Sequence, residues 1–146
     1  MAHSSLRPVD YRALADFRYE IRRYLQFGKR AARAVGIDPQ QYQALLAIKG
    51  LRDPFKATVG FLAGQLQIRH HSAVELTHRL ARNGWVRRVR GRADRREVLL
   101  RLTSRGEHLL AQLSLSHRQE LRTAGPKLIE ALQTAIAHKR RPHRGT

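Results

Sequence analysis

The chain has 146 residues, of which 29 are Lys or Arg and 11 are Asp or Glu, so its formal net charge is +18. This length suits one domain with a hydrophobic core, and a hydrophobic content of 42% excludes a disordered basic tail. The absence of cysteine excludes disulfides, thiolate zinc sites and thiol redox switches.

Charge and targeting signals narrow the possible partners. A sequence pI of about 11.7 favours a polyanionic partner, although a basic protein that is merely soluble is the alternative. No apolar run reaches membrane-spanning length, and the segment MAHSSLRPVD lacks the apolar core of a signal peptide. We therefore expect a cytoplasmic protein with no membrane partner.

The first predicted element is one long helix from Asp10 to about Val35. Apolar-leaning residues recur along it at alternating steps of three and four, namely Leu14, Phe17, Ile21, Tyr24, Gly28, Ala31 and Val35. This spacing is typical of a heptad-like seam. Packing within the monomer is one interpretation, but the helix is long for so small a chain, so we favour a partner helix. Residues 1–37 are therefore predicted to form an N-terminal dimerisation helix.

Two shorter helices follow, and each begins at a recognisable N-cap. Asp38 caps a helix whose first position is Pro39, and Thr58 caps the next, which ends in a short break at residues 67–68. The stretch RHHSAVELTHRL, residues 69–80, then begins a further helix, which ends at Asn83-Gly84. The helix capped by Thr58 and the helix that begins in residues 69–80 are short and separated by a tight turn. This pair is typical of a helix-turn-helix.

The helix in RHHSAVELTHRL has two different faces. An apolar-leaning stripe at helical spacing consists of Ala73, Leu76, Thr77 and Leu80. The outer face carries His71, Glu75, His78, Arg79 and Arg82. The helix is therefore predicted to pack along the stripe and to present histidines and arginines outward.

A β-hairpin is predicted after this helix. The segments WVRRVR and EVLLRL are rich in β-branched or apolar residues and flank the loop GRADRR. A helix-turn-helix followed by a hairpin is a winged helix-turn-helix, which we assign to residues 38–103. Residues 69–105 contain eleven arginines and three acids, an excess of eight positive charges. Because this charge lies on the two elements that can enter DNA grooves, duplex DNA is favoured over RNA or an acidic protein.

The last part of the chain is predicted to be helical again. Thr103 caps a helix that carries Leu109, Leu110 and Leu113, and Gly125-Pro126 separates it from a final helix. That final helix is built on Leu128, Ile129, Leu132 and Ile136, and a basic tail follows. Residues 104–146 are assigned to C-terminal dimerisation helices and the tail. The fold class is mainly α with a small β-hairpin wing, one structural domain overall.

Contacts with DNA can be assigned residue by residue. His70, His71 and Ser72 lie at the start of the helix, where recognition helices contact base edges. Glu75 could accept a hydrogen bond from a cytosine amine, or pair with Arg79 instead. Phosphate contacts are expected from Arg79 and Arg82. The residues of the wing expected at the DNA are Arg92, Asp94, Arg95 and Arg96.

Nearly the whole chain resembles MarR-family transcriptional regulators. The resemblance is carried by SAVEL, NGWVRR, the Asp-x-Arg pattern of Asp94 and Arg96, and RLTSRGE. It implies a homodimer held by helices from both chain ends, a palindromic operator, and a repressor released by a small ligand. It also implies that Asp94 orients Arg96 toward the minor groove. The implied effector pocket would be lined by Tyr24, Phe27, Tyr42 and Trp85, although each of these residue types is more often plain core.

Four positions depart from the usual family pattern. Phe61 stands where a Glu commonly closes a capping box with the Thr, and Gly64 replaces a helix former at a cost of about 1 kcal/mol. Arg69 replaces a capping serine, and His78 replaces an acid. These departures affect base readout and leave the fold unchanged.

Two other kinds of function have less support in the sequence. His71, Glu75 and His78 could share a helix face as zinc ligands, but DNA needs that face and no further acid or cysteine joins it. No catalytic set of nucleophile, base and orienting acid can be assembled, so neither an enzyme nor a cofactor is expected. The alternative to a sequence-specific regulator is a winged-helix protein that packs nucleic acid without sequence choice.

Overall fold

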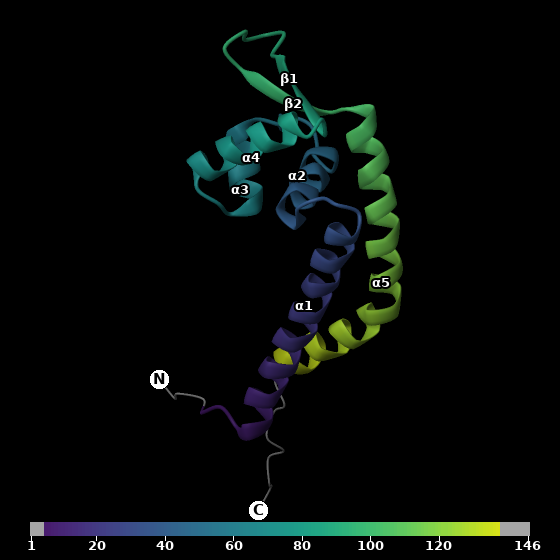
Figure 1. Ribbon diagram of the computed structural model, residues 1–146. Coiled ribbons are helices and arrows are strands. Elements are labelled where there is room, and N and C mark those ends of the chain that lie inside the picture. The colour runs from purple at the N-terminus through teal and green to yellow at the C-terminus, as the bar shows by residue number, and fades with distance from the viewer. Residues whose placement is uncertain (1–4, 138–146) are drawn as a thin grey trace, which may run out of the picture. The chain divides into compact units, whose positions relative to one another are not determined.

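The computed structural model describes residues 5–137. Five helices and one two-stranded sheet make up this part of the chain, which confirms the predicted mainly α fold with a β-hairpin (Figure 1). The elements in chain order are α1 (Pro8–Ala34), α2 (Pro39–Lys49), α3 (Val59–Leu66), α4 (His70–Arg82), β1 (Val86–Arg90), β2 (Val98–Leu102) and α5 (Ser104–Ile136).

The contacts divide the chain into two compact units. One contains residues 29–116, with α2, α3, α4 and the hairpin. The other is formed, within the described residues, by 5–28 and 117–137, the outer parts of α1 and α5. Among the helices of residues 5–137, none combines the length and the apolar character that crossing a membrane requires.

Side-chain caps fix the starts of α2 and of α3, the first helix of the helix-turn-helix. The Asp38 carboxylate accepts a hydrogen bond from the Gln40 amide at 2.9 Å, and Pro39 occupies the first turn of α2. The Thr58 hydroxyl accepts from the Phe61 amide at 3.1 Å at the start of α3. Both predicted N-caps are confirmed. Each satisfies an amide that would otherwise lack a partner at a helix start.

The end of α4 is a glycine turn. Gly84 has a φ of +74°, in the left-handed region that favours glycine. The Trp85 amide donates to the Leu80 carbonyl at 3.0 Å and the Gly84 amide to the Ala81 carbonyl at 3.0 Å. This pairing satisfies the last carbonyls of the helix and turns the chain directly into β1.

The core of the unit formed by residues 29–116 lies beneath the helix-turn-helix and the hairpin. Its fully buried leucines come from α2, α3 and α4, namely Leu45, Leu62, Leu76 and Leu80. β1 and β2 pair antiparallel, from Val86 opposite Leu102 to Arg90 opposite Val98. The Leu100 amide donates to the Ala57 carbonyl at 2.9 Å, which joins the hairpin to the segment before α3.

The prediction of two helices after Thr103 was wrong, because α5 continues through Pro126 to Ile136. Proline has no amide hydrogen, so the carbonyl four residues earlier, that of Arg122, loses its usual donor. Both Arg122 and Pro126 are exposed, and water can replace the missing donor. The missing bond is therefore tolerated, and the helix continues even though Gly125 directly before the proline is a weak helix former.

The start of α5 packs directly on the chain after α4. The Thr103 hydroxyl donates to the Gly84 carbonyl at 2.6 Å and accepts from the Gly106 amide at 3.0 Å, as expected of a helix cap. A Cβ atom on Gly106 would collide with the carbonyl oxygen of Trp85. The close approach of these two backbones therefore requires a glycine.

We expect Gly106→Ala to lower the free energy of unfolding by about 1–3 kcal/mol, because the added methyl forces two backbones apart. Gly64→Ala is the matched control, since a Cβ there meets no atom within 4 Å. It should raise stability by up to about 1 kcal/mol through helix propensity alone. Urea unfolding followed by circular dichroism measures both. Equal stability of the two variants would contradict the proposed contact.

Candidate nucleic-acid interface

The helix α4 separates its packing residues from its polar residues. The predicted stripe of Ala73, Leu76, Thr77 and Leu80 is buried. The side chains of His71, Glu75, His78, Arg79 and Arg82 are exposed, as predicted. At the C-terminal end, the side-chain amide of Asn83 donates to the side-chain carbonyl of Gln41 at 3.1 Å, which fixes α4 against α2. The helix is thus held from below while its outer face stays open to solvent.

The beginning of α4 carries no side-chain cap. Arg69 occupies the N-cap position and its side chain makes no capping hydrogen bond. His70 and His71 are exposed and Ser72 is half-buried. Amide groups in the first turn of a helix bind anions such as phosphate, and the helix dipole favours negative charge there. Because Arg69 stands in place of a capping serine, the N-terminal end of α4 carries both uncapped backbone amide donors and a positive charge.

The alternative pairing of Glu75 with Arg79 is not formed in the structure. Within residues 5–137 the ion pairs join Arg7 with Asp10, Lys49 with Glu107 and Lys56 with Glu97. Both Glu75 and Arg79 are exposed. Each is therefore accessible to a partner from outside the chain.

The wing loop, residues 91–97, is closed by its own hydrogen bonds. The Gly91 amide donates to the Glu97 carbonyl at 2.8 Å, and the Glu97 amide donates to the Asp94 carbonyl at 3.1 Å. A Cβ atom on Gly91 would lie 2.6 Å from the Asp94 carbonyl oxygen, so the closure needs a glycine. The side chains of Arg92, Arg95 and Arg96 are exposed around this loop.

Asp94 meets Arg96 through the main chain. Its carboxylate accepts a hydrogen bond from the Arg96 amide at 2.9 Å. This is the Asx type of turn, in which a short acidic side chain stands in for a backbone acceptor. The contact fixes the backbone at Arg96, whose side chain extends from an ordered turn.

The base of the wing is held by a contact that sequence analysis missed. Lys56 Nζ lies 3.1 Å from Glu97 Oε2, with the Lys56 side chain half-exposed and that of Glu97 25% exposed. The two residues are 41 positions apart in the chain. Their opposite charges were the signal available in the sequence, but no local spacing rule connects them.

All eleven arginines between residues 69 and 105 are exposed. Besides Arg90, whose guanidinium donates to the Arg95 carbonyl at 3.4 Å, Arg105 also contacts the rest of the chain. Its guanidinium lies 4.4 Å from the centre of the Trp85 ring and donates to the Asn83 carbonyl at 3.1 Å. The arginines of α4 and the wing form a positively charged surface with few internal partners.

The residues predicted to line an effector pocket fall in both units. Tyr42 and Trp85 are buried in the core of residues 29–116, and Tyr42 Oη lies 3.3 Å from Ser114 Oγ. Tyr24 and Phe27 belong to the other unit, where their rings meet His117 edge-on with centroid distances of 6.5 and 5.7 Å. Tyr42 and Trp85 therefore serve as core residues.

The metal alternative concerned His71, Glu75 and His78. Across residues 5–137, no three side chains of His, Cys, Asp or Glu come together as a set that could hold a metal ion. The three residues lie on the exposed face of α4.

Comparison with known proteins agrees with this geometry. Residues 35–97 match the model of the MarR family. The chain is 29% identical over 97 residues to the uncharacterized HTH-type transcriptional regulator YsmB of Bacillus subtilis, covering 66% of this chain and 64% of that protein. The chain thus spans less than two thirds of the length of this relative.

Two solved structures illustrate the shared fold. AbsC, a MarR family transcriptional regulator from Streptomyces coelicolor, has a TM-score of 0.72 and 16% identity, covering 92% of this chain and 93% of AbsC. A mutant of MarR from E. coli complexed with operator DNA has a TM-score of 0.61 and 20% identity, covering 82% of this chain and 90% of that one. Residues 35–97, which contain α3, α4, β1 and the wing loop, therefore resemble the MarR family, and the two solved structures share the winged helix-turn-helix fold of this chain.

Proposed function

We propose that the protein is a sequence-specific, DNA-binding transcriptional regulator that binds a palindromic operator as a homodimer and acts as a repressor released by a small ligand. The exposed outer face of α4 beside the arginine-rich wing carries this proposal. Support comes from the HTH-type regulator that the chain resembles and from the MarR mutant that was crystallised with operator DNA.

The two ends of α4 have different chemistry. The first turn presents His70, His71 and Ser72, which can donate or accept hydrogen bonds. The later turns present Arg79 and Arg82, which suit phosphate oxygens. Direct base readout needs hydrogen-bonding groups at base edges, so the first turn is the reading end and the later turns position the helix.

A protein that packs nucleic acid without sequence choice is the second candidate. It is favoured by the density of exposed arginines on the wing, since backbone contacts carry no sequence information. It leaves the uncharged polar start of α4 without a role. The comparison of variants below separates the two candidates.

We expect Arg82→Ala to weaken binding to every DNA sequence alike and to reduce the salt slope by about one unit, since it removes one phosphate contact. His71→Ala or Ser72→Ala should spare non-specific binding and cost about 1–3 kcal/mol at one or two operator positions. Selection from random DNA followed by titrations at several salt concentrations measures both effects. Equal loss by the His71 variant on all sequences would favour the packing protein.

Asp94→Ala tests the order of the wing. Simple electrostatics predicts tighter DNA binding, because the variant loses a negative charge near phosphates. We expect weaker binding instead, by about three- to tenfold, since the hydrogen bond that orders the Arg96 backbone is lost. Asp53→Ala is the control, because Asp53 is an exposed acid outside α4 and the wing. Tighter binding by Asp94→Ala at fixed salt would contradict the ordering role.

The homodimer rests on the unit built from the two chain ends. Of the hydrophobic residues described in 5–28 and 117–137, only Ala13 is buried. Large hydrophobic side chains are exposed there instead, namely Leu6, Val9, Tyr11, Leu14, Tyr19, Leu25, Leu121, Ile129, Leu132 and Ile136. Exposed large hydrophobic side chains in this number favour an interface, and helices that bury so few side chains have little stability alone. A second copy of the chain would supply the missing core.

We expect the protein to sediment as a dimer at micromolar concentration. Leu14→Glu or Leu132→Glu should weaken the dimer by at least about tenfold, because a charge would be buried without a partner. Leu115→Glu is the control, since Leu115 is exposed but lies in the unit of residues 29–116. A monomeric wild type that binds DNA with one chain per site would overturn the dimer.

A further inference from the structure

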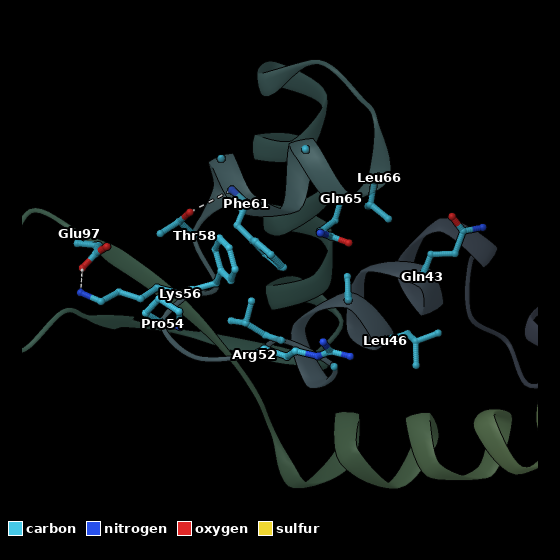
Figure 2. Close-up of a pocket in the computed structure, with 16 residues that line it drawn as sticks. Gln43, Leu46, Arg52, Pro54, Lys56, Thr58, Phe61, Gln65, Leu66 and Glu97 are labelled. Carbon is cyan, nitrogen blue, oxygen red and sulfur yellow. Dashed lines mark hydrogen bonds and ion pairs between the residues drawn. The ribbon is translucent and has the colours of Figure 1, made fainter.

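A groove of about 1170 Å³ lies along α2 and α3, and none of its lining residues belongs to α4. It is lined by residues of α2, α3 and the connection between them, and it reaches Glu97 at the base of the wing (Figure 2). Its volume is somewhat above the usual range of small-molecule sites, about 300–1,000 Å³. All of its lining residues belong to the unit of residues 29–116.

The groove is apolar and lacks a cover. Phe55 is 65% exposed and Leu46 is 47% exposed, and the half-buried Phe61 projects from α3 into the same space. Gly60 and Gly64, one helical turn apart, contribute no side chain to the lining. A Cβ atom on Gly64 would meet nothing within 4 Å. The two glycines therefore leave room for an aromatic or alicyclic ring system beside Phe61.

The rim of the groove is positively charged. Arg52 and Lys56 line it together with one acid, Glu97. Lys56 is paired with Glu97 at 3.1 Å, whereas Arg52 takes part in none of the ion pairs within residues 5–137. Thr58 and Gly60 bring the N-terminal end of α3 to the rim, where the helix dipole also favours an anion. The groove thus combines apolar lining residues with a net positive charge at its rim.

We propose that this groove binds a small amphipathic anion, with an apolar ring system against Phe55 and Phe61 and a single carboxylate or sulfonate at Arg52 and Lys56. The bound anion competes with Glu97 for Lys56. As a step in regulation the proposal rests on the proposed DNA-binding function, but the binding itself does not.

Competition for Lys56 would reach the wing through Glu97. The main chain of Glu97 accepts from the Gly91 amide and donates to Asp94, so this residue closes the wing loop. Its side chain ties that loop to the segment before α3. When the anion replaces Glu97 at Lys56, one of the attachments of the wing is lost and DNA binding weakens. By linkage, bound DNA lowers the affinity of the protein for the anion by the same factor.

Two fluorescent probes of similar ring structure test the site without DNA. Anilinonaphthalene sulfonate carries the anion, and phenylnaphthylamine is neutral. We expect the wild type to bind the anionic probe with the higher affinity. Gly64→Leu should lower the affinity for both probes by at least about tenfold, because the leucine side chain fills the groove. Gly64→Ala, which raises helix propensity but adds only a methyl group, should weaken them much less.

Charge variants test the competition. Lys56→Gln should weaken the anionic probe about threefold and leave the neutral probe unchanged, a magnitude typical of a partly exposed pair. Glu97→Gln should strengthen the anionic probe by a similar factor, because the competing acid is gone. Lys49→Gln is the matched control, since Lys49 pairs with Glu107 at 3.0 Å and does not line the groove. It should change neither affinity.

The last measurement adds DNA selected for tight binding. The anionic probe should weaken DNA binding by the wild type and by Lys49→Gln, but not by Gly64→Leu. Unchanged probe affinity in Gly64→Leu would overturn the site, and equal behaviour of Lys56→Gln and Lys49→Gln would overturn the competition. If the probes respond as expected but no DNA is bound at all, the proposed function fails while the binding site stands.

Discussion

The backbone junction after α4 holds α4, the wing and the start of α5 together. At this point the Trp85 carbonyl accepts a hydrogen bond from the Thr103 amide, and the Gly84 carbonyl accepts one from the Thr103 hydroxyl. Gly106 lets the first turn of α5 touch Trp85 directly. The end of α4, β1 and the start of α5 therefore share one set of hydrogen bonds. Because this contact is made by main-chain atoms, its geometry tolerates little adjustment.

The backbone contacts after α4 support a high density of positive charge on α4 and the wing. The arginines of α4 and the wing are exposed and repel one another, and internal acids neutralise few of them. Two acids in the wing act on the backbone or its attachment instead: Asp94 binds the amide of Arg96, and Glu97 binds Lys56. The negative charges therefore order the loop at a small cost in net positive charge. This arrangement suits a surface whose counterions are supplied by a polyanion.

The two units of the chain differ in how much of a hydrophobic core each contains. Residues 29–116 contain a continuous core from α2, α3, α4 and the hairpin. The described residues of the chain ends expose most of their large hydrophobic side chains. The first unit can hold the exposed face of α4 beside the wing by itself, while the second buries few of its own hydrophobic side chains. In the proposed homodimer, folding and DNA binding would depend on the concentration of the chain.

The sequence by itself determined the caps at Asp38 and Thr58, the buried stripe of α4, the glycine turn and the hairpin, since each depends on residues a few positions apart. The MarR resemblance and the arginine excess were likewise visible in the residues. Only the tertiary structure decided that α5 continues through Pro126, that Tyr42 and Trp85 are core, and that Lys56 meets Glu97. These features depend on solvent exposure and on contacts between distant segments, which local spacing does not encode.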